Sequence, residues 1–138
     1  MYKTILLTLD ASPADKPIID HVGALAARLQ SRVVLLHVVT AAQAQFLGAD
    51  AGGATVDEKR EYLEKVRREF EAAGTAVSVE LAYGEPAREI VRWVEAHECD
   101  LVAMGTHGHR WLSDMVLGFT ASRVQHAVRV PVLLLRRT

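Results

Sequence analysis

The segment from Gly105 to Gly118 carries the residues best suited to chemistry in this sequence. Glycine lets backbone amides approach an anion closely. A helix is expected to begin near Gly118, and its unpaired amides and positive dipole end favour negative charge. His109 and Arg110 add side-chain donors. The combination suits a phosphate group, although glycines at a strand end also serve turn geometry alone, and both interpretations stay open.

Asp10 is the second candidate, because it stands at the end of the first apolar run. Its carboxylate would repel phosphate but can accept a hydrogen bond from an adenine amino group or a ribose hydroxyl. It can also cap the following helix together with Ser12. The two roles are compatible.

Other reactive side chains do not assemble into a recognisable catalytic or metal motif. His107 and His109 are one residue apart and His126 lies further on, but a metal site needs more ligands in a confirming geometry. Cys99 has no cationic neighbour in sequence that would activate its thiol. The sequence contains no Walker A loop, no G-x-G-x-x-G after the first strand and no G-x-S-x-G elbow. We therefore expect a binding protein without catalytic residues.

Apolar runs that favour strands alternate with amphipathic helical stretches, as in a doubly wound open parallel sheet with helices on both faces. The predicted strands are Ile5–Leu9, Val33–Val39, Ala76–Ala82, Leu101–Met104 and Val132–Leu135. Helices are expected from Ser12, Thr55 and Pro86, and from about Gly118 to Val128. Ligands bind such sheets beyond the carboxyl ends of the strands, where strand order reverses. Asp10 and the Gly105–Gly118 segment should meet there.

The first two helices have one apolar face each. In the first, Ile18 to Leu29 provide the inward positions, and in the second the inward face extends from Val56 to Ala73. Glu61 with Lys65, and Glu64 with Arg68, are spaced to pair on the outer face of the second helix. These charges predict a solvated surface rather than a binding patch.

Composition places the chain among compact globular proteins. Its 138 residues suit one domain, 1–138, and the net charge of -1 gives no reason to expect nucleic acid as a partner. No apolar run approaches the roughly 20 residues that span a bilayer, and Met1–Leu7 predicts a first strand rather than a cleaved leader. A single cysteine fits a reducing cytoplasm.

Several segments together resemble the universal stress protein family across nearly the whole chain. They are Leu9–Ser12, His37–Val39, Gly84–Ala87, Asp100–Gly108 and Val130–Leu134. The resemblance implies a five-stranded sheet in the order 3-2-1-4-5, similar to adenine-nucleotide α-hydrolases, and ATP as ligand with Mg²⁺ as its companion ion. The nucleotide-binding residues it implies are Asp10, Ala11, Val38, Met104, Gly105, Gly108, His109, Arg110, Gly118, Phe119 and Thr120.

One position departs from the family pattern. ATP-binding members resemble Gly-x2-Gly-x9-Gly-[Ser/Thr], which Gly105, Gly108 and Gly118 match, but Phe119 occupies the last position. Phe119 lacks the hydroxyl donor, and Thr120 is the nearest substitute. Two main functions therefore remain: a regulatory protein that binds ATP or a related adenine nucleotide, or a stress-response interaction module whose phosphate site Phe119 impairs. A slow ATPase or nucleotidyl-transfer enzyme is a third, weaker alternative.

The resemblance also implies a homodimer joined through Val132–Leu135, an apolar strand at a sheet edge. A regulatory partner of unknown identity would complete the assembly. The irregular stretch from Thr40 to Ala54 is long for a compact domain, as a functional lid or a mobile loop would be.

Overall fold

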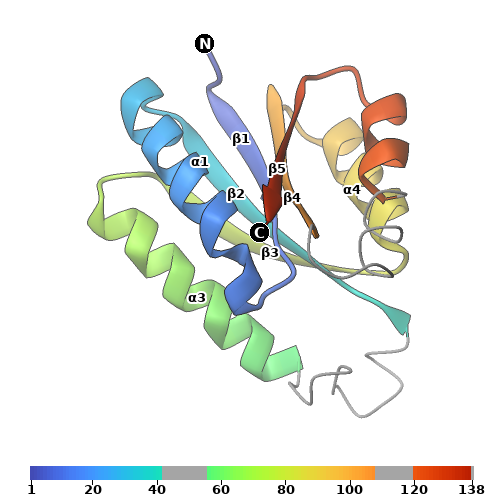
Figure 1. The fold of residues 1–138 in the computed structure, drawn as a ribbon, viewed down its shortest axis with the longest axis horizontal. Coiled ribbons are helices and arrows are strands. Elements are labelled where there is room, and N and C mark those ends of the chain that lie inside the picture. Colours follow the sequence, from blue (N-terminus) through green and yellow to red (C-terminus); the bar gives the residue numbers. More distant parts are fainter. Residues whose placement is uncertain (42–55, 108–119, 138) are drawn as a thin grey trace.

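The fold is one five-stranded parallel sheet with helices on both faces, as the sequence predicts. A computed structural model describes residues 1–41, 56–107 and 120–137 (Figure 1). The sheet order is β3-β2-β1-β4-β5. The strands are β1 Thr4–Thr8, β2 Arg32–Val39, β3 Val77–Tyr83, β4 Leu101–His107 and β5 Val132–Arg137. The predicted order is confirmed, with β3 and β5 at the two edges.

The central strands are buried on both faces, because helices cover each side of the sheet. Leu6 and Leu7 in β1 and Val33 in β2 are all fully buried. Leu7 of β1 is in register with Leu35 of β2 on one side and Ala103 of β4 on the other. Burial on both faces explains why β1 and β2 are apolar at consecutive positions instead of alternating between apolar and polar residues.

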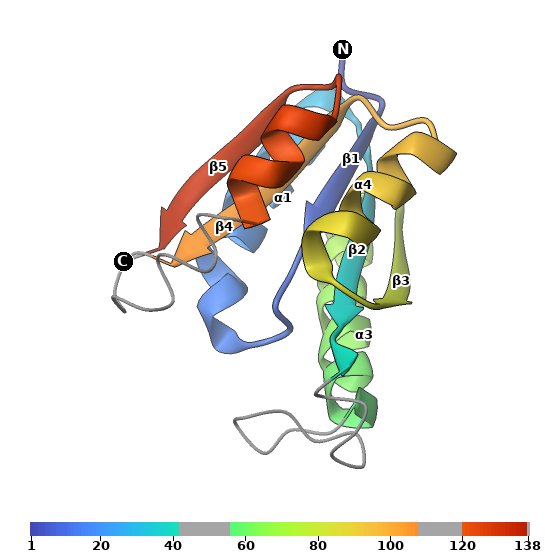
Figure 2. The same cartoon turned by 90° about the vertical axis from the view of Figure 1, so that its right-hand side faces the viewer.

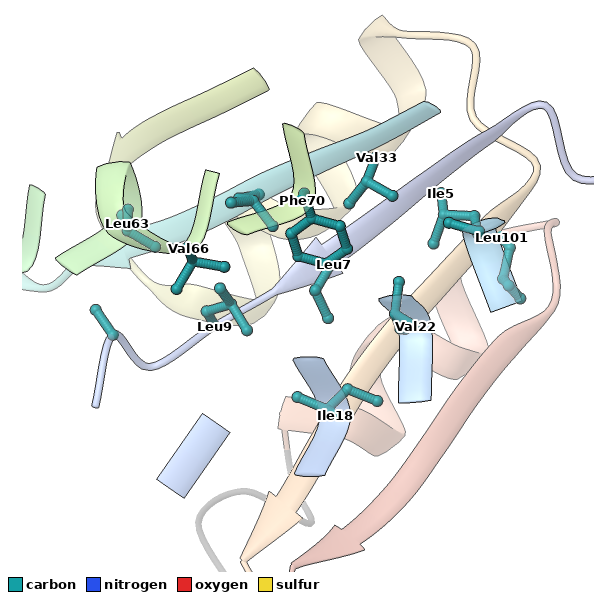
Figure 3. Packing of buried hydrophobic residues seen from close by; sticks show 14 residues of the cluster. Ile5, Leu7, Leu9, Ile18, Val22, Val33, Leu63, Val66, Phe70 and Leu101 are labelled. Carbon is teal, nitrogen blue, oxygen red and sulfur yellow. The ribbon is translucent and has the colours of Figure 1, made fainter. Parts of the chain in front are cut away.

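Two helices pack on one face of the sheet (Figure 1). They are α1 Lys16–Leu29, which follows the short 3₁₀ helix η1 Pro13–Asp15, and α3 Val56–Ala72. Figure 3 shows Ile18 and Val22 of α1 with Leu63, Val66 and Phe70 of α3 packed over β1. The helical periodicity of the apolar residues therefore decides which face each helix turns inward.

The ends of α1 and α3 differ from the sequence prediction. Leu29 was expected inward but is 37% exposed, because it is the last residue of α1. Ala73 was also expected inward but lies beyond the end of α3 and is exposed. Gly74, at a φ of +87°, turns the chain there, and the backbone N–H of Thr75 bonds the carbonyl of Phe70 at 3.0 Å.

The other face of the sheet carries α4 Pro86–Ala96 and a helix over residues 120–127 (Figure 2). Ala87 and Ile90 of α4 pack with Ala121 and Val124 of that helix in a second buried cluster. The predicted helix start at Gly118 and most of the Thr40–Ala54 stretch lie outside the described residues.

β4 is longer than predicted. The sequence prediction ends the strand at Met104 and gives Gly105 to the following loop. In the structure Gly105, Thr106 and His107 continue the ladder, opposite Leu135, Arg136 and Arg137 of β5. Pairing with β5 extends the strand through residues that locally favour a turn.

Candidate functional site

A small cavity of about 140 Å³ lies at the carboxyl ends of β1, β2 and β4. This is the switch point of the sheet, because β1 has β2 on one side and β4 on the other. The lining residues come from three strand ends, α4 and the helix over 120–127. They are Thr8, Leu9, Asp10, Leu36, His37, Val38, Pro86, Ile90, Met104, Gly105 and Thr120.

Five of the predicted site residues line this cavity. They are Asp10, Val38, Met104, Gly105 and Thr120. Ala11 follows Asp10 in the same turn and is buried, but it does not line the cavity. Gly108, His109, Arg110, Gly118 and Phe119 lie outside the described residues.

Sequence reasoning missed the remaining six lining residues. Thr8, Leu9, Leu36 and His37 belong to the same two strand ends as Asp10 and Val38. His37 carried a signal, since it is a polar residue within an otherwise apolar strand. Pro86 and Ile90 come from the start of α4, and only its packing across the sheet brings them to the cavity.

The turn that carries Asp10 is built around a buried carboxylate. Asp15 is 0% exposed, and its oxygens accept the backbone N–H groups of Asp10 at 3.0 Å, Ala11 at 2.8 Å and Ser12 at 3.2 Å. Ala11 has a φ of +64°, a conformation that costs a non-glycine residue about 1 kcal/mol or more. Consecutive N–H groups then converge on one anion, as in a backbone nest.

Side chains of α3 bind the carbonyl side of the same turn. Lys59 Nζ donates to the carbonyl oxygens of Asp10 at 3.1 Å and Ala11 at 3.3 Å, and its residue is only 7% exposed. Tyr62 donates its hydroxyl to the carbonyl of Ser12 at 2.8 Å. The turn is therefore held from two sides by elements far apart in sequence.

His37 fastens the end of β1 to β2. Its Nδ1 lies 2.9 Å from the carbonyl oxygen of Leu9, so Nδ1 carries the proton in this hydrogen bond. The backbone N–H of Leu9 bonds the carbonyl of Leu36 at 2.9 Å and continues the strand pairing one residue further. Both bonds fix the strand end immediately before Asp10.

Glu85 joins α4 to the helix over residues 120–127. One carboxylate oxygen caps α4 by accepting the backbone N–H of Arg88 at 3.0 Å, and the other pairs with Arg123 at 2.6 Å. Gly84, at a φ of +146°, has the Glu89 side chain only 3.0 Å from where a Cβ would lie. The chain thus needs glycine where it enters this helix.

Cys99 and the candidate metal ligands are the other reactive groups to be assessed within the described residues. Burial raises the pKa of the Cys99 thiol, and the neighbouring Asp100 carboxylate raises it further, which keeps the thiol protonated at neutral pH. Over residues 1–41, 56–107 and 120–137, no group of three or more His, Cys, Asp or Glu side chains could hold a metal ion. In the same residues no helix is long and apolar enough to cross a membrane.

The cavity is small and mostly apolar. Val38, Ile90 and Met104 are among its apolar lining residues, and Asp10 is the acidic residue of the lining. Its volume is below the roughly 300–1,000 Å³ of sites that enclose a whole drug-sized molecule. A ring system with a hydrogen-bond donor on its edge fits this pattern.

Fold and cavity together define an open, doubly wound α/β protein with a small, mostly apolar cavity at its switch point. Residues 1–136 match the model of the universal stress protein family, and the chain belongs to that family. Universal stress protein MJ0531 of Methanocaldococcus jannaschii is 31% identical, over 99% of this chain and 84% of the relative.

Solved structures of the same fold include several universal stress proteins. The structure of MJ0577 has a TM-score of 0.79 at 28% identity, covering 100% of this chain and 98% of that one. A universal stress protein in complex with cAMP has a TM-score of 0.76 at 20% identity, covering 99% of both chains. An Archaeoglobus fulgidus member in complex with dAMP has a TM-score of 0.68 at 16% identity, covering 96% and 97%. At these identities the last two show the shared fold.

Proposed function

We propose that this protein is a non-catalytic regulatory protein of the stress response that binds ATP or a related adenine nucleotide in the cavity at the switch point. The observation that carries the proposal is the fixed position of Asp10 at the rim of an apolar hollow. Two family members of the same fold have been solved with adenine nucleotides, cAMP and dAMP. Their ligands support adenine as the group that the hollow accepts.

The adenine ring would lie against Val38, Ile90 and Met104, and burying its faces there would provide most of the affinity. The Asp10 carboxylate would accept a hydrogen bond from the ring amino group or a ribose hydroxyl. A hydrogen bond to a charged group contributes about 1.5–3 kcal/mol. Asp10 therefore gives selectivity for a ligand with a donor at that point.

The phosphates would extend toward Gly105 and Thr120, the lining residues nearest in sequence to the segment 108–119. The glycine spacing of this segment is the sequence feature that favours phosphate there. Mg²⁺ would accompany the phosphates of ATP. His37 Nδ1 is bonded to the Leu9 carbonyl, so this histidine has a role in fixing the strand end.

Isothermal titration calorimetry with ATP tests the proposal, together with mass spectrometry of any ligand released from the purified protein. Asp10→Ala should weaken ATP binding by roughly 10- to 100-fold, the equivalent of one hydrogen bond to a charged group. Asp20→Ala is the matched control, because Asp20 is an exposed carboxylate on α1 that does not line the cavity. No heat with ATP, AMP or cAMP at millimolar concentration would refute the proposal.

Phe119 favours a second candidate, an interaction module that binds no nucleotide because its phosphate site is impaired. The variant Phe119→Ser separates the two. Under the alternative, wild-type protein binds no ATP and Phe119→Ser gains binding. Equal ATP affinity in both proteins would contradict the impairment.

We also propose a homodimer that pairs through β5, in the cytoplasm. β5 is an edge strand and Leu134 is 37% exposed on it. An apolar edge of this kind is usually covered. Sedimentation velocity should give a dimer at micromolar concentration, and Leu134→Lys should shift it toward monomer. A wild-type monomer would contradict this assembly.

A further inference from the structure

Lys59 is a buried cation that does not line the cavity. It stands in the first turn of α3 and is 7% exposed. Removing an ammonium group from water costs several kcal/mol unless its protons are bonded. Its ammonium group donates to the backbone carbonyls of Asp10 and Ala11, at 3.1 and 3.3 Å. The charge is thus directed at the turn that carries the cavity carboxylate.

The two peptide units of this turn are each bonded on both edges. In the unit from Asp10 to Ala11, the carbonyl accepts from Lys59 and the N–H donates to Asp15. The next unit, from Ala11 to Ser12, has the same two partners. A planar peptide unit held at both edges cannot rotate. Lys59 and Asp15 together therefore fix the left-handed conformation of Ala11. They also fix the peptide unit that follows Asp10, and so help to set the direction in which the Asp10 side chain leaves the backbone.

We propose that Lys59 is a positioning residue of the nucleotide site, which acts on the ligand through Asp10. The inference rests on the proposed function, because it requires a nucleotide that binds at Asp10. Without the Lys59 ammonium, the two carbonyls lose their partner and the turn gains alternative conformations. Asp10 then spends less time in the binding pose, and ligand affinity falls by that fraction.

The same contact links nucleotide binding to α3. Binding that fixes Asp10 also favours the Lys59 contacts, because coupling between two sites is reciprocal. Lys59 is only three residues after Val56, where α3 begins and the 42–55 segment ends. ATP should therefore slow amide hydrogen exchange in the first turns of α3 as well as in the turn at Asp10.

A double-mutant cycle separates positioning from general stabilisation. Lys59→Met removes the ammonium and keeps an unbranched apolar stem, and Lys65→Met is the matched control on the exposed face of the same helix. Lys59→Met should weaken ATP binding by about tenfold. In an Asp10→Ala background the same change should alter affinity by less than about twofold, because the group it positions is gone.

Equal weakening by Lys59→Met in both backgrounds would show a purely structural role and overturn the inference. So would unchanged affinity of Lys59→Met beside a wild type that binds ATP. If Lys59→Met does not fold by circular dichroism, Lys59→Gln replaces it in the same cycle. Its neutral amide bonds the turn more weakly than the ammonium, so affinity should fall by less than tenfold, and again only when Asp10 is present. A wild type that binds no adenine nucleotide overturns the proposed function and this inference with it.

Discussion

Asp15→Asn is the substitution that most directly tests how the site is built. The side chain keeps its shape, but one oxygen becomes an amide group that donates. The Asp15 oxygens accept three backbone N–H groups, one at Oδ1 and two at Oδ2. In the best orientation the amide oxygen keeps the two bonds at Oδ2. The new NH₂ group then faces the N–H of Asp10, donor against donor.

The cost follows from the burial of Asp15, which is 0% exposed. A hydrogen bond to a charged group contributes about 1.5–3 kcal/mol and a neutral one about 1 kcal/mol. Two bonds are therefore weakened by roughly 1 kcal/mol each and the third is lost. The free energy of unfolding should fall by about 3–5 kcal/mol, and the Tm by roughly 10–15 °C for a chain of this size.

Urea unfolding followed by circular dichroism measures this change, with Asp20→Asn as control. Asp20 pairs with Lys16 on the exposed face of α1, where an ion pair contributes under about 1 kcal/mol. The same chemical change on neighbouring elements should thus give very different losses. A loss below about 1 kcal/mol for Asp15→Asn would refute the claim that this carboxylate organises the turn.

Three further predictions concern other parts of the molecule. Gln30→Gly should raise the free energy of unfolding by about 1 kcal/mol, because Gln30 ends α1 at a φ of +55°, whereas Gln30→Ala should not. Leu63→Ala should cost about 2–5 kcal/mol in urea unfolding, since Leu63 is fully buried, and Leu29→Ala, at the exposed end of α1, should cost much less. Iodoacetamide should modify Cys99 at pH 8 more slowly than in the urea-unfolded chain, because burial and Asp100 raise the pKa of the thiol; equal rates would contradict this.

Strand positions and helix faces follow from local pattern, which is why they could be predicted, whereas the sheet order 3-2-1-4-5 was implied by the family resemblance. The run from Val33 to Val39 is apolar at nearly every position because it is covered on both faces. The length of β4 could not be predicted, since Gly105 to His107 resemble a turn and become strand only by pairing with β5. The predicted burial of Leu29 and Ala73 was wrong for a related reason. Periodicity shows which face of a helix is buried, but not the residue at which the helix ends.

The candidate site divides in the same way. Asp10 was predictable from its place at the end of the first strand, and the structure puts it at the cavity with Val38 and Met104. Lys59 was not, because in sequence it is one more charge on a highly charged helix. The charges on the solvated face did not pair as expected either: Arg67 contacts Glu64 and Glu71. Only contacts between residues nearly 50 apart distinguish Lys59 from these.

The two ends of the proposed site can be separated by ligand length. The turn that carries Asp10 is proposed to meet the base and ribose. Lys59→Met should therefore weaken the binding of adenosine, AMP and ATP by a similar factor. Phe119 directly follows the Gly105–Gly118 segment proposed to meet the phosphates, so Phe119→Ser should change ATP affinity and leave adenosine affinity nearly unchanged. Calorimetry with the three ligands on both variants gives the two profiles. If Lys59→Met affected ATP alone, its role would lie with the phosphates, and positioning through Asp10 would be the wrong explanation.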